Sequence, residues 1–473
     1  MSAPERRPAL SFRDLVVFCL VTGMSVRWIA TAATIGPSAI TIWVAALIFF
    51  YLPLLVAVLE LSSRFEGGDG GIYDWSKQAL GRWSGFMTGW TYWTSNLPYF
   101  PALLLFAADA ASHLISKDPA ALAANRAYVL TFSLVALWLA TFVNVIGLRF
   151  GKWLFDLGAV GNWGPVAILM ILAFVASGRF GSASSFTLHS LVPTVNFQQA
   201  IFWSSIVFAV GGSEASAFLR HEVVDAPRVY PRALLVAGVL VAVGYIGGTI
   251  AILVILPASQ LSGLGGIMDA IVAGSARLGW SGLAPLIALL LVASNVGQVG
   301  SWLAATARLP FVAGIDRYLP AAFGRMHPRF GTPHHAFIWQ SLLATVFIVI
   351  SQAGTTVALA YNILIGMGII SYFLPYLFTF ASVIRMQTVP AGPDVIRPPG
   401  GRVTATILAA IGFTVVLFGI VLACFPAADE TNKPLAVFKV VGSMVLLVAV
   451  GQFIYWNGTR RGAGSREAGA GRR

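Results

Sequence analysis

Long runs of apolar residues alternate along the chain with short segments rich in charge, proline or glycine. Twelve of these runs approach the ~20 residues that an α-helix needs to cross a bilayer. They lie near residues 14–35, 38–60, 86–113, 127–148, 154–176, 200–218, 232–256, 280–307, 334–352, 355–382, 403–424 and 436–456. The pattern predicts an all-α membrane protein with twelve transmembrane helices.

Composition excludes a soluble globular protein. Hydrophobic residues make up 58% of the 473 residues and charged residues only 10%, and the mean hydropathy is +0.81. Soluble domains carry about 25% charged residues. The two cysteines, Cys19 and Cys424, both fall within predicted spans, so we expect no disulfide framework.

The net charge of +12 is distributed unevenly between the two sides of the predicted membrane. If the N-terminus is cytoplasmic, 23 of the 30 Lys and Arg residues lie on the inner side and Arg27 lies within a span. The six on the outer side are Lys117, Arg126, Arg179, Arg277, Lys433 and Lys439. This bias places both termini in the cytoplasm, and it explains the basic charge without a nucleic-acid partner.

The first and sixth spans are interrupted by Gly and by charged residues, and each opens a group of five spans. Such paired interruptions are typical of secondary transporters built from an inverted repeat, with the binding site where the repeats meet. We therefore expect a transport core over 14–382, made of repeats at 14–176 and 200–382. Helices 11 and 12 follow at 403–456, and cytoplasmic tails cover 1–13 and 457–473. The N-terminal 32 residues imitate a signal peptide, but their removal would delete the first broken helix, so we expect them to be retained.

The interruption of span six contains adjacent glycines, Gly211 and Gly212, followed by Glu214. Each glycine costs roughly 1 kcal/mol in a helix interior, so unwinding that exposes backbone groups to a ligand is one reading and close helix packing is the other. A carboxylate at this depth is costly unless it is paired. The candidate substrate-binding residues here are Phe208, Ala209, Val210, Gly211, Gly212 and Glu214.

The interruption of span one places Arg27 roughly 20 Å from the inner membrane edge, at a rise of 1.5 Å per residue. A buried guanidinium needs a carboxylate, backbone carbonyls or an anionic substrate group. Two roles stay open and can coexist: an ion pair with Glu214 or Asp109, and direct contact with the substrate. The candidate residues are Gly23, Met24, Ser25, Val26 and Arg27.

Span eight carries a polar stripe of Ser294, Gln298 and Ser301 on an otherwise apolar helix. Such a stripe lines either water or a neighbouring helix, and both readings stay open. Trp302 follows the stripe, and together with Phe208 and Trp28 it could close over a substrate. We therefore add Ser294, Gln298 and Trp302 to the candidate substrate-binding residues.

Motifs of soluble enzymes are missing from the sequence. It has no phosphate-binding loop, no zinc-protease motif and no Cys or His cluster. We therefore expect a protein that is not an enzyme and has no cofactor and no metal site. The expected partners are a small-molecule substrate and the lipid bilayer.

Four segments resemble the amino acid, polyamine and organocation transporter superfamily, and the resemblance extends from about Arg13 to Trp456. They are Glu60 with residues 70–81; Phe208 to Glu214; Glu222 to Ala233, which contains Asp225-Ala226-Pro227-Arg228; and Ser301 through Asp316-Arg317-Tyr318-Leu319-Pro320 to Pro333. The resemblance implies a LeuT-type 5+5 inverted repeat with two extra helices. It also implies that backbone from Gly23 to Arg27 holds a substrate carboxylate, that carbonyls from Ala209 to Gly212 hold its amino group, and that Phe208 acts as a gate.

The chain departs from this family pattern at two places. Met24-Ser25-Val26-Arg27 replaces the usual Gly-Ser-Gly type of run, and Asn162 stands where several proton-coupled relatives carry a lysine. Proton coupling through that lysine is therefore not expected. The loop at 114–126 contains no Cys, so no disulfide-linked heavy subunit is expected either.

These observations favour a permease of amino acids or related small amines that works by alternating access in a cell membrane, with a bacterial inner membrane as the favoured location. We hypothesise that Arg27 supplies positive charge for a substrate carboxylate. The alternative is an amino-acid-binding membrane sensor without net transport, although a sensor would be expected to carry a larger cytoplasmic domain.

Overall fold

The computed structural model describes residues 10–65, 71–146, 151–194, 196–280, 282–306, 326–426, 430 and 432–470. Nearly all of these residues are helical, and the described part of the chain contains no strand beyond an isolated bridge between Leu10 and Val223. The resemblance segment around residues 307–320, Gly70, and the outermost ends of both tails lie outside the described residues.

The first half of the chain forms α1 (Phe12–Gly23), α2 (Arg27–Ala33), α3 (Ala39–Ala46), η1 (Leu47–Tyr51), α4 (Leu52–Arg64), α5 (Ile72–Leu80), α6 (Arg82–Thr94), α7 (Asn96–Ile115), α8 (Pro119–Ala124), α9 (Arg126–Ile146), α10 (Gly151–Phe180) and α11 (Leu188–Leu191). The second half forms α12 (Phe197–Ala209), η3 (Ser213–Glu222), α13 (Ala226–Ile255), η4 (Ala258–Gln260), α14 (Gly266–Leu278), α15 (Leu283–Thr306), α17 (His334–Gln352), α18 (Val357–Met386), α19 (Gly401–Ala423), α20 (Lys433–Val437), η7 (Phe438–Gly442) and α21 (Ser443–Ala470).

Eleven helical segments of the described chain are long and apolar enough to cross a membrane, and α1 with α2 forms a further candidate bent by 48°. The all-α fold with up to twelve spans is therefore confirmed. The candidate spans extend beyond several predicted bounds: 86–113 becomes Arg82–Ile115, and 436–456 becomes Lys433–Arg460. The division into two inverted repeats stays a prediction.

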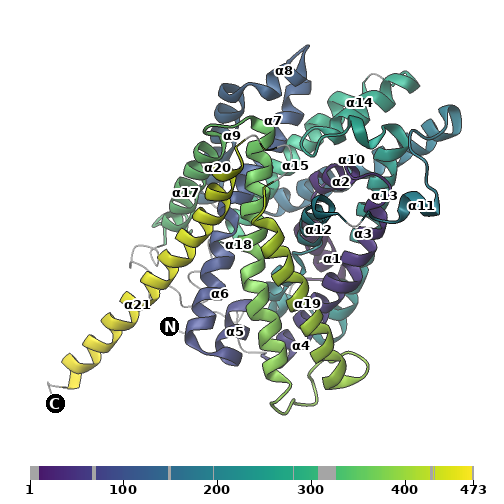
Figure 1. Ribbon diagram of the computed structural model, residues 1–473. Coiled ribbons are helices and arrows are strands. Elements are labelled where there is room, and N and C mark those ends of the chain that lie inside the picture. The colour runs from purple at the N-terminus through teal and green to yellow at the C-terminus, as the bar shows by residue number, and fades with distance from the viewer. Residues whose placement is uncertain are drawn as a thin grey trace.

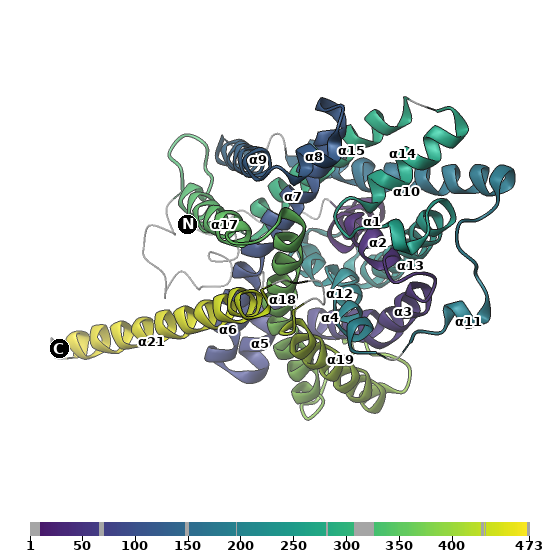
Figure 2. The same ribbon diagram turned by 45° about the horizontal axis from the view of Figure 1, so that its top comes forward.

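The apolar helices form one bundle around α18 (Figures 1 and 2). α18 packs against α6 and α7 on one side and against α12 on another, while α19 lies along it. α10 and α7 both pack against α15, and α13 packs against α1 and α2. The two broken helices thus lie inside the bundle, where protein can satisfy the backbone groups that a break exposes.

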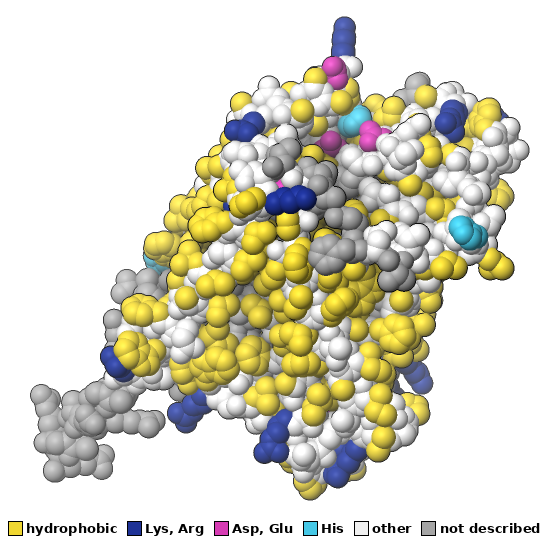
Figure 3. Space-filling model, in the orientation of Figure 1, with side chains coloured by type: hydrophobic (Ala, Val, Ile, Leu, Met, Phe, Trp, Pro, Cys, Tyr) yellow, Lys and Arg dark blue, Asp and Glu magenta, His cyan; other side chains and the backbone are white. Residues whose placement is uncertain are grey.

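Side chains on the visible face separate by type (Figure 3). Hydrophobic side chains cover its middle, and Lys and Arg gather at the lower end of the view, where α4 and the turn between α18 and α19 lie. Asp, Glu and His appear near the upper end, together with further basic residues. The apolar band has the position that a bilayer would cover.

Candidate functional site

The two helix breaks touch one another through their backbones. α1 ends at Gly23, Met24 is extended (φ −132°, ψ 133°), and α2 starts at Arg27. α12 ends at Ala209, and Gly212 has φ +110° before η3 begins. A Cβ on Gly212 would overlap the carbonyl oxygen of Thr22 and approach Gly23 Cα at 3.1 Å. Glycine is therefore required at 212 both for its positive φ and for the close approach.

Beyond the second break the chain does not resume as an α-helix. Residues Ser213–Glu222 form a 3₁₀ helix, which is tighter than an α-helix. The unwound residues of the break are Val210, Gly211 and Gly212, so the interruption lies at the glycine pair as predicted.

A small buried cavity of about 30 Å³ lies between the two breaks. Its lining residues come from both breaks and from α7, α13, α15 and α18: Thr22, Gly23, Met24, Ser25, Trp28, Asn96, Tyr99, Phe208, Ala209, Gly211, Tyr245, Trp302 and Tyr372. The structure therefore brings together seven of the predicted binding residues: Gly23, Met24, Ser25, Phe208, Ala209, Gly211 and Trp302. The other seven are buried nearby but do not line this cavity: Val26, Arg27, Val210, Gly212, Glu214, Ser294 and Gln298.

Aromatic rings close around the cavity. The ring of Phe208 packs edge-on against Trp28 at 5.3 Å and against Tyr372 at 5.4 Å between ring centroids. Trp302 lies 6.2 Å from Tyr99 in a similar edge-on arrangement. The three aromatic residues expected to close over a substrate, Phe208, Trp28 and Trp302, thus all face the same space.

Besides Thr22, four lining residues were not singled out from the sequence: Asn96, Tyr99, Tyr245 and Tyr372. Each carries a polar group inside an apolar span, where it must find a partner within the protein. The presence of these polar groups inside apolar spans could be recognised in the sequence. The sequence could not show that the four residues meet at one cavity, because they come from three helices that are distant along the chain.

Glu214 is fully buried, and tyrosine hydroxyls bind its carboxylate. Tyr372 donates to Oε1 at 2.6 Å, Tyr376 donates to Oε2 at 2.7 Å, and Tyr92 donates to Oε1 at 3.1 Å. The backbone N–H of Gly212 donates to Oε2 at 3.0 Å. These four donors bind both oxygens of the carboxylate. The ion pair between Arg27 and Glu214, which the sequence left open, is not found.

Arg27 is 1% exposed and stacks against aromatic rings. Its guanidinium carbon lies 4.4 Å from the ring centre of Trp28 and 4.9 Å from that of Tyr99, both within the range of cation–π attraction. Among the residues that the structure describes, no carboxylate forms an ion pair with it, and its Nε and Nη1 atoms have no hydrogen-bond partner. A buried cation with unused donors is thus held beside two cavity-lining rings.

Asp109, the other partner considered for Arg27, lies near Asp269 of α14 instead. One carboxylate oxygen of each residue lies within 3.5 Å of the position that a Cβ on Gly265 would take. Partial burial raises the pKa of Asp269, which lies outside the candidate spans. Asp109 therefore belongs to a separate acidic pair at the upper end of Figure 1, where α14 lies.

The polar stripe of span eight faces other helices rather than lipid. Ser294, Gln298 and Ser301 are at most 6% exposed, and the Ser294 hydroxyl donates to the carbonyl of Gly158 in α10 at 3.4 Å. Neither side-chain polar atom of Gln298 has a partner among the described residues. From α10, Asn162 donates to the carbonyl of Met24 at 3.0 Å. The neutral amide of Asn162 therefore binds the backbone of the first break, at the position where a lysine was noted in several proton-coupled relatives.

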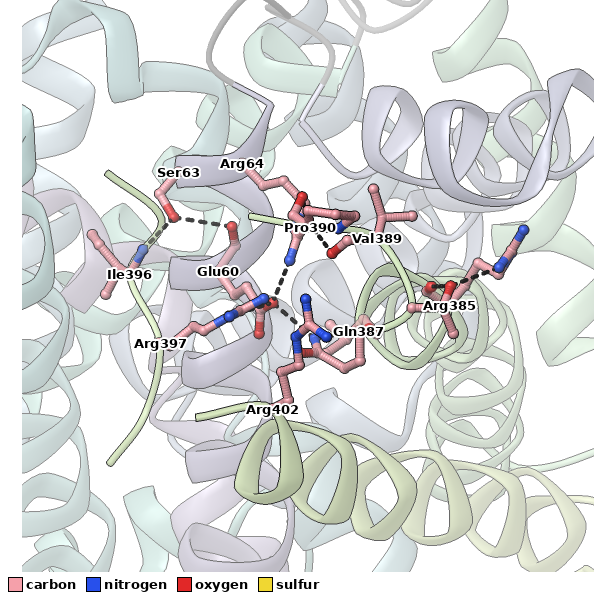
Figure 4. A network of polar contacts seen from close by, with 12 residues as sticks. Glu60, Ser63, Arg64, Arg385, Gln387, Val389, Pro390, Ile396, Arg397 and Arg402 are labelled. Carbon is pink, nitrogen blue, oxygen red and sulfur yellow. Dashed lines mark hydrogen bonds and ion pairs between the residues drawn. The ribbon is translucent and has the colours of Figure 1, made fainter. Parts of the chain in front are cut away.

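A second polar cluster lies at the lower end of Figure 1 and joins α4 to the segment that follows α18 (Figure 4). Glu60 of α4 is fully buried and accepts from Arg64 at 3.2 Å and from Gln387 at 2.8 Å, both through Oε1. Arg397 forms an ion pair with the same oxygen at 3.7 Å. The neighbouring Ser63 hydroxyl accepts from the backbone N–H of Ile396 at 2.9 Å. We call Glu60, Ser63, Arg64, Gln387, Ile396 and Arg397 the Glu60 cluster.

A bundle of apolar helices, in which two broken helices share a buried cavity, defines the class of multi-pass membrane transporters. The chain belongs to the amino acid permease family, whose model matches residues 13–450. The superfamily resemblance found in the sequence is thereby confirmed.

Three relatives cover most of the chain. An uncharacterized transporter of Legionella pneumophila is 26% identical over 457 residues, which is 95% of this chain and 96% of that protein. A probable agmatine/putrescine antiporter of Lactococcus lactis is 22% identical and covers 90% of each chain. A glutamate/gamma-aminobutyrate antiporter of Lactococcus lactis is 25% identical over 85% of this chain and 80% of its own.

Proposed function

We propose that this chain is a secondary active permease that moves amino acids or related small amines across a cell membrane by alternating access. The observation that best supports the proposal is the shared cavity, into which unwound backbone of both broken helices projects beside aromatic rings. Broken helices at a repeat interface place their backbone groups on substrates in this kind of transporter.

The charges around the cavity favour a substrate that carries a carboxylate. No charged side chain lines the cavity. Glu214 is occupied by three tyrosines, whereas Arg27 has unused donors and lies against Trp28 and Tyr99. We infer that Arg27 supplies the positive charge for the carboxylate, and that backbone from Gly23 to Arg27 binds it while carbonyls from Ala209 to Gly212 bind the amino group.

The size of the cavity requires a rearrangement during binding. A volume of about 30 Å³ accommodates little more than a water molecule or two. Phe208, which packs between Trp28 and Tyr372, must therefore move before an amino acid can enter. This is the behaviour expected of an aromatic gate in alternating access.

The basic residues favour one orientation in the membrane. Arg64, Arg385, Arg397 and Arg402 lie together at the lower end of Figure 1, where the Glu60 cluster is found (Figure 4). Positive residues concentrate on the cytoplasmic side of membrane proteins. We therefore propose that this end faces the cytoplasm, together with both termini.

The first experiment is a thermal-shift screen of the purified protein against L-glutamate, L-lysine and L-arginine, and against cadaverine and agmatine, the carboxylate-free amines formed by decarboxylation of L-lysine and L-arginine. A ligand at 100 times its Kd adds about 2.7 kcal/mol of stability. Stabilisation by an amino acid without stabilisation by its amine supports carboxylate recognition. Stabilisation by amines alone would overturn it.

Transport is then measured with the protein reconstituted in liposomes, because the sensor alternative binds its ligand without moving it. Substitution Arg27→Met should weaken binding of the amino acid about tenfold or more, since a hydrogen bond to a charged group contributes roughly 1.5–3 kcal/mol. Arg27→Lys keeps the charge and should retain part of the affinity. Unchanged affinity in Arg27→Met would contradict the assigned role.

A further inference from the structure

Tyr245 of α13 binds both helix breaks through one hydroxyl group. The hydroxyl accepts from the backbone N–H of Ser25 at 3.0 Å and donates to the carbonyl of Ala209 at 2.9 Å. A tyrosine hydroxyl has one proton to donate and lone pairs to accept with, so it can form both bonds at once. The two bonds join the unwound part of the first broken helix to the end of α12.

These two backbone groups are of the kinds that an amino acid substrate would use. An amide N–H suits a carboxylate, and a carbonyl oxygen suits an ammonium group. The Tyr245 hydroxyl therefore accepts a hydrogen bond from the first break, as the carboxylate of the proposed substrate would. It donates one to the second break, as the ammonium group of that substrate would. It also lines the cavity, so a substrate and the tyrosine hydroxyl would compete for the same backbone groups.

The side chain of Tyr245 is held firmly in this position. It is fully buried, and its ring stacks on Trp43 at 4.3 Å with an interplanar angle of 8°. The indole N–H of Trp43 donates in turn to the Thr249 hydroxyl at 3.0 Å, one turn further along α13. The stacked rings of Trp43 and Tyr245 thus hold the hydroxyl in a fixed position beside the two breaks.

We propose that the Tyr245 hydroxyl substitutes for the substrate's polar groups, so that the two breaks can close together without a substrate. A buried amide or carbonyl without a partner is unfavourable, and a transporter whose breaks lacked such a partner could close only when loaded. Tyr245 therefore sets the balance between net transport, which needs the unloaded protein to reorient, and exchange, which does not. This inference rests on the proposed transport function.

The first test needs no substrate and uses a native cysteine. Cys19 of α1 is 3% exposed, and α1 packs against η3, so its reaction with N-ethylmaleimide reports on separation of the two broken helices. Substitution Cys424→Ser leaves Cys19 as the sole cysteine. In this background Tyr245→Phe should speed the labelling of Cys19 about tenfold in ligand-free protein.

The matched control is Tyr128→Phe. It also removes a tyrosine hydroxyl that donates to a backbone carbonyl, that of Ala108 at 2.8 Å, but it lies between α9 and α7 and away from the breaks. This variant should label within twofold of the parent. Equal labelling rates in Tyr245→Phe and in the parent would overturn the inference.

The second test compares two fluxes of radiolabelled L-glutamate in liposomes. Efflux into glutamate-free buffer measures net transport, and efflux into buffer with glutamate measures exchange. Tyr245→Phe should lower net efflux about tenfold more than it lowers exchange. A parallel fall of both fluxes would show a merely structural role. If the parent moves no glutamate in either assay, L-glutamate is not its substrate, and the labelling result still decides the role of Tyr245 in closure.

Discussion

The hydroxyl of Tyr372 donates a 2.6 Å hydrogen bond to Oε1 of Glu214. An ionisable group at this depth in a membrane protein commonly pairs with an opposite charge. Here phenols from α18 and α6 and a backbone N–H from the second break bind it instead. Glu214 therefore fastens η3 to two neighbouring helices, and Tyr372 connects this buried carboxylate to the cavity that it lines.

The two tyrosines on Oε1 should differ in their effect on stability. Tyr372→Phe removes the 2.6 Å bond and Tyr92→Phe the 3.1 Å bond. A hydrogen bond to a charged group contributes roughly 1.5–3 kcal/mol, so we expect Tyr372→Phe to lower the melting temperature more than Tyr92→Phe. Thermal unfolding in detergent measures this, and the reverse order would show that the bond lengths do not reflect the strength of the contacts.

Gly212→Ala should disrupt the contact between the two breaks. The new methyl group would overlap the Thr22 carbonyl at a φ of +110°, which other residues rarely adopt. We expect the variant to lose transport and to melt at a lower temperature. Gly178→Ala is the matched control, because nothing lies within 4 Å of its added Cβ. It should behave like the parent, and equal behaviour of both variants would refute the close approach.

A pair of glutamine substitutions tests the polar stripe of α15. Gln298 has no partner among the described residues, whereas Gln340 exchanges hydrogen bonds with Thr306 at 3.0 and 3.4 Å. Gln340→Met should therefore destabilise the protein, by about 1–3 kcal/mol for a lost partner. Gln298→Met should leave the stability unchanged or higher.

The same variants separate the two readings of the stripe. If Gln298 contacts substrate or water in the pathway, Gln298→Met lowers the liposome flux even though the protein remains stable. If the stripe serves helix packing alone, the flux follows stability in both variants. We expect the first result, because an unpaired buried amide is otherwise hard to explain.

Glu60→Gln should weaken the Glu60 cluster. The substitution leaves the buried side chain of Arg64 and the half-buried side chain of Arg397 without their carboxylate, and breaking a buried ion pair costs roughly 3 kcal/mol or more. The control is Asp225→Asn, which makes the same chemical change in an exposed ion pair with Arg228 at 3.6 Å. Such a pair contributes roughly 0–1 kcal/mol. Thermal unfolding of both variants checks the difference, and equal losses would contradict it.

The sequence was sufficient to predict the apolar helices and the position of both breaks. Apolar runs identify spans because lipid leaves helices as the main solution for a crossing chain. The glycine pair at Gly211 and Gly212 located the second break, since glycines are costly in a helix interior. The short helix α5 (Ile72–Leu80) was not predicted, because its apolar content is too low to resemble a span.

The partners of the buried polar groups could not be predicted from the sequence. Glu214 binds Tyr92 and Tyr372, which lie 122 and 158 residues away along the chain. An ion pair with an acid was one of the two roles left open for Arg27, and the structure instead stacks it on Trp28 and Tyr99. Such pairings depend on which faces of distant helices meet, and hydrophobic patterning does not encode that information for spans that are apolar all round.

The Glu60 cluster bears on how the protein could be divided. Glu60 lies early in the predicted ten-span core, yet Gln387 and Arg397 bind it from the segment between α18 and α19. A fragment that ended with α18 at Met386 would keep every predicted span of the core and lose these two partners, leaving a buried carboxylate that only Arg64 could neutralise. We therefore expect the core to be less stable without this segment, and any truncation, chimera or split version of the protein should place its junction beyond Arg397.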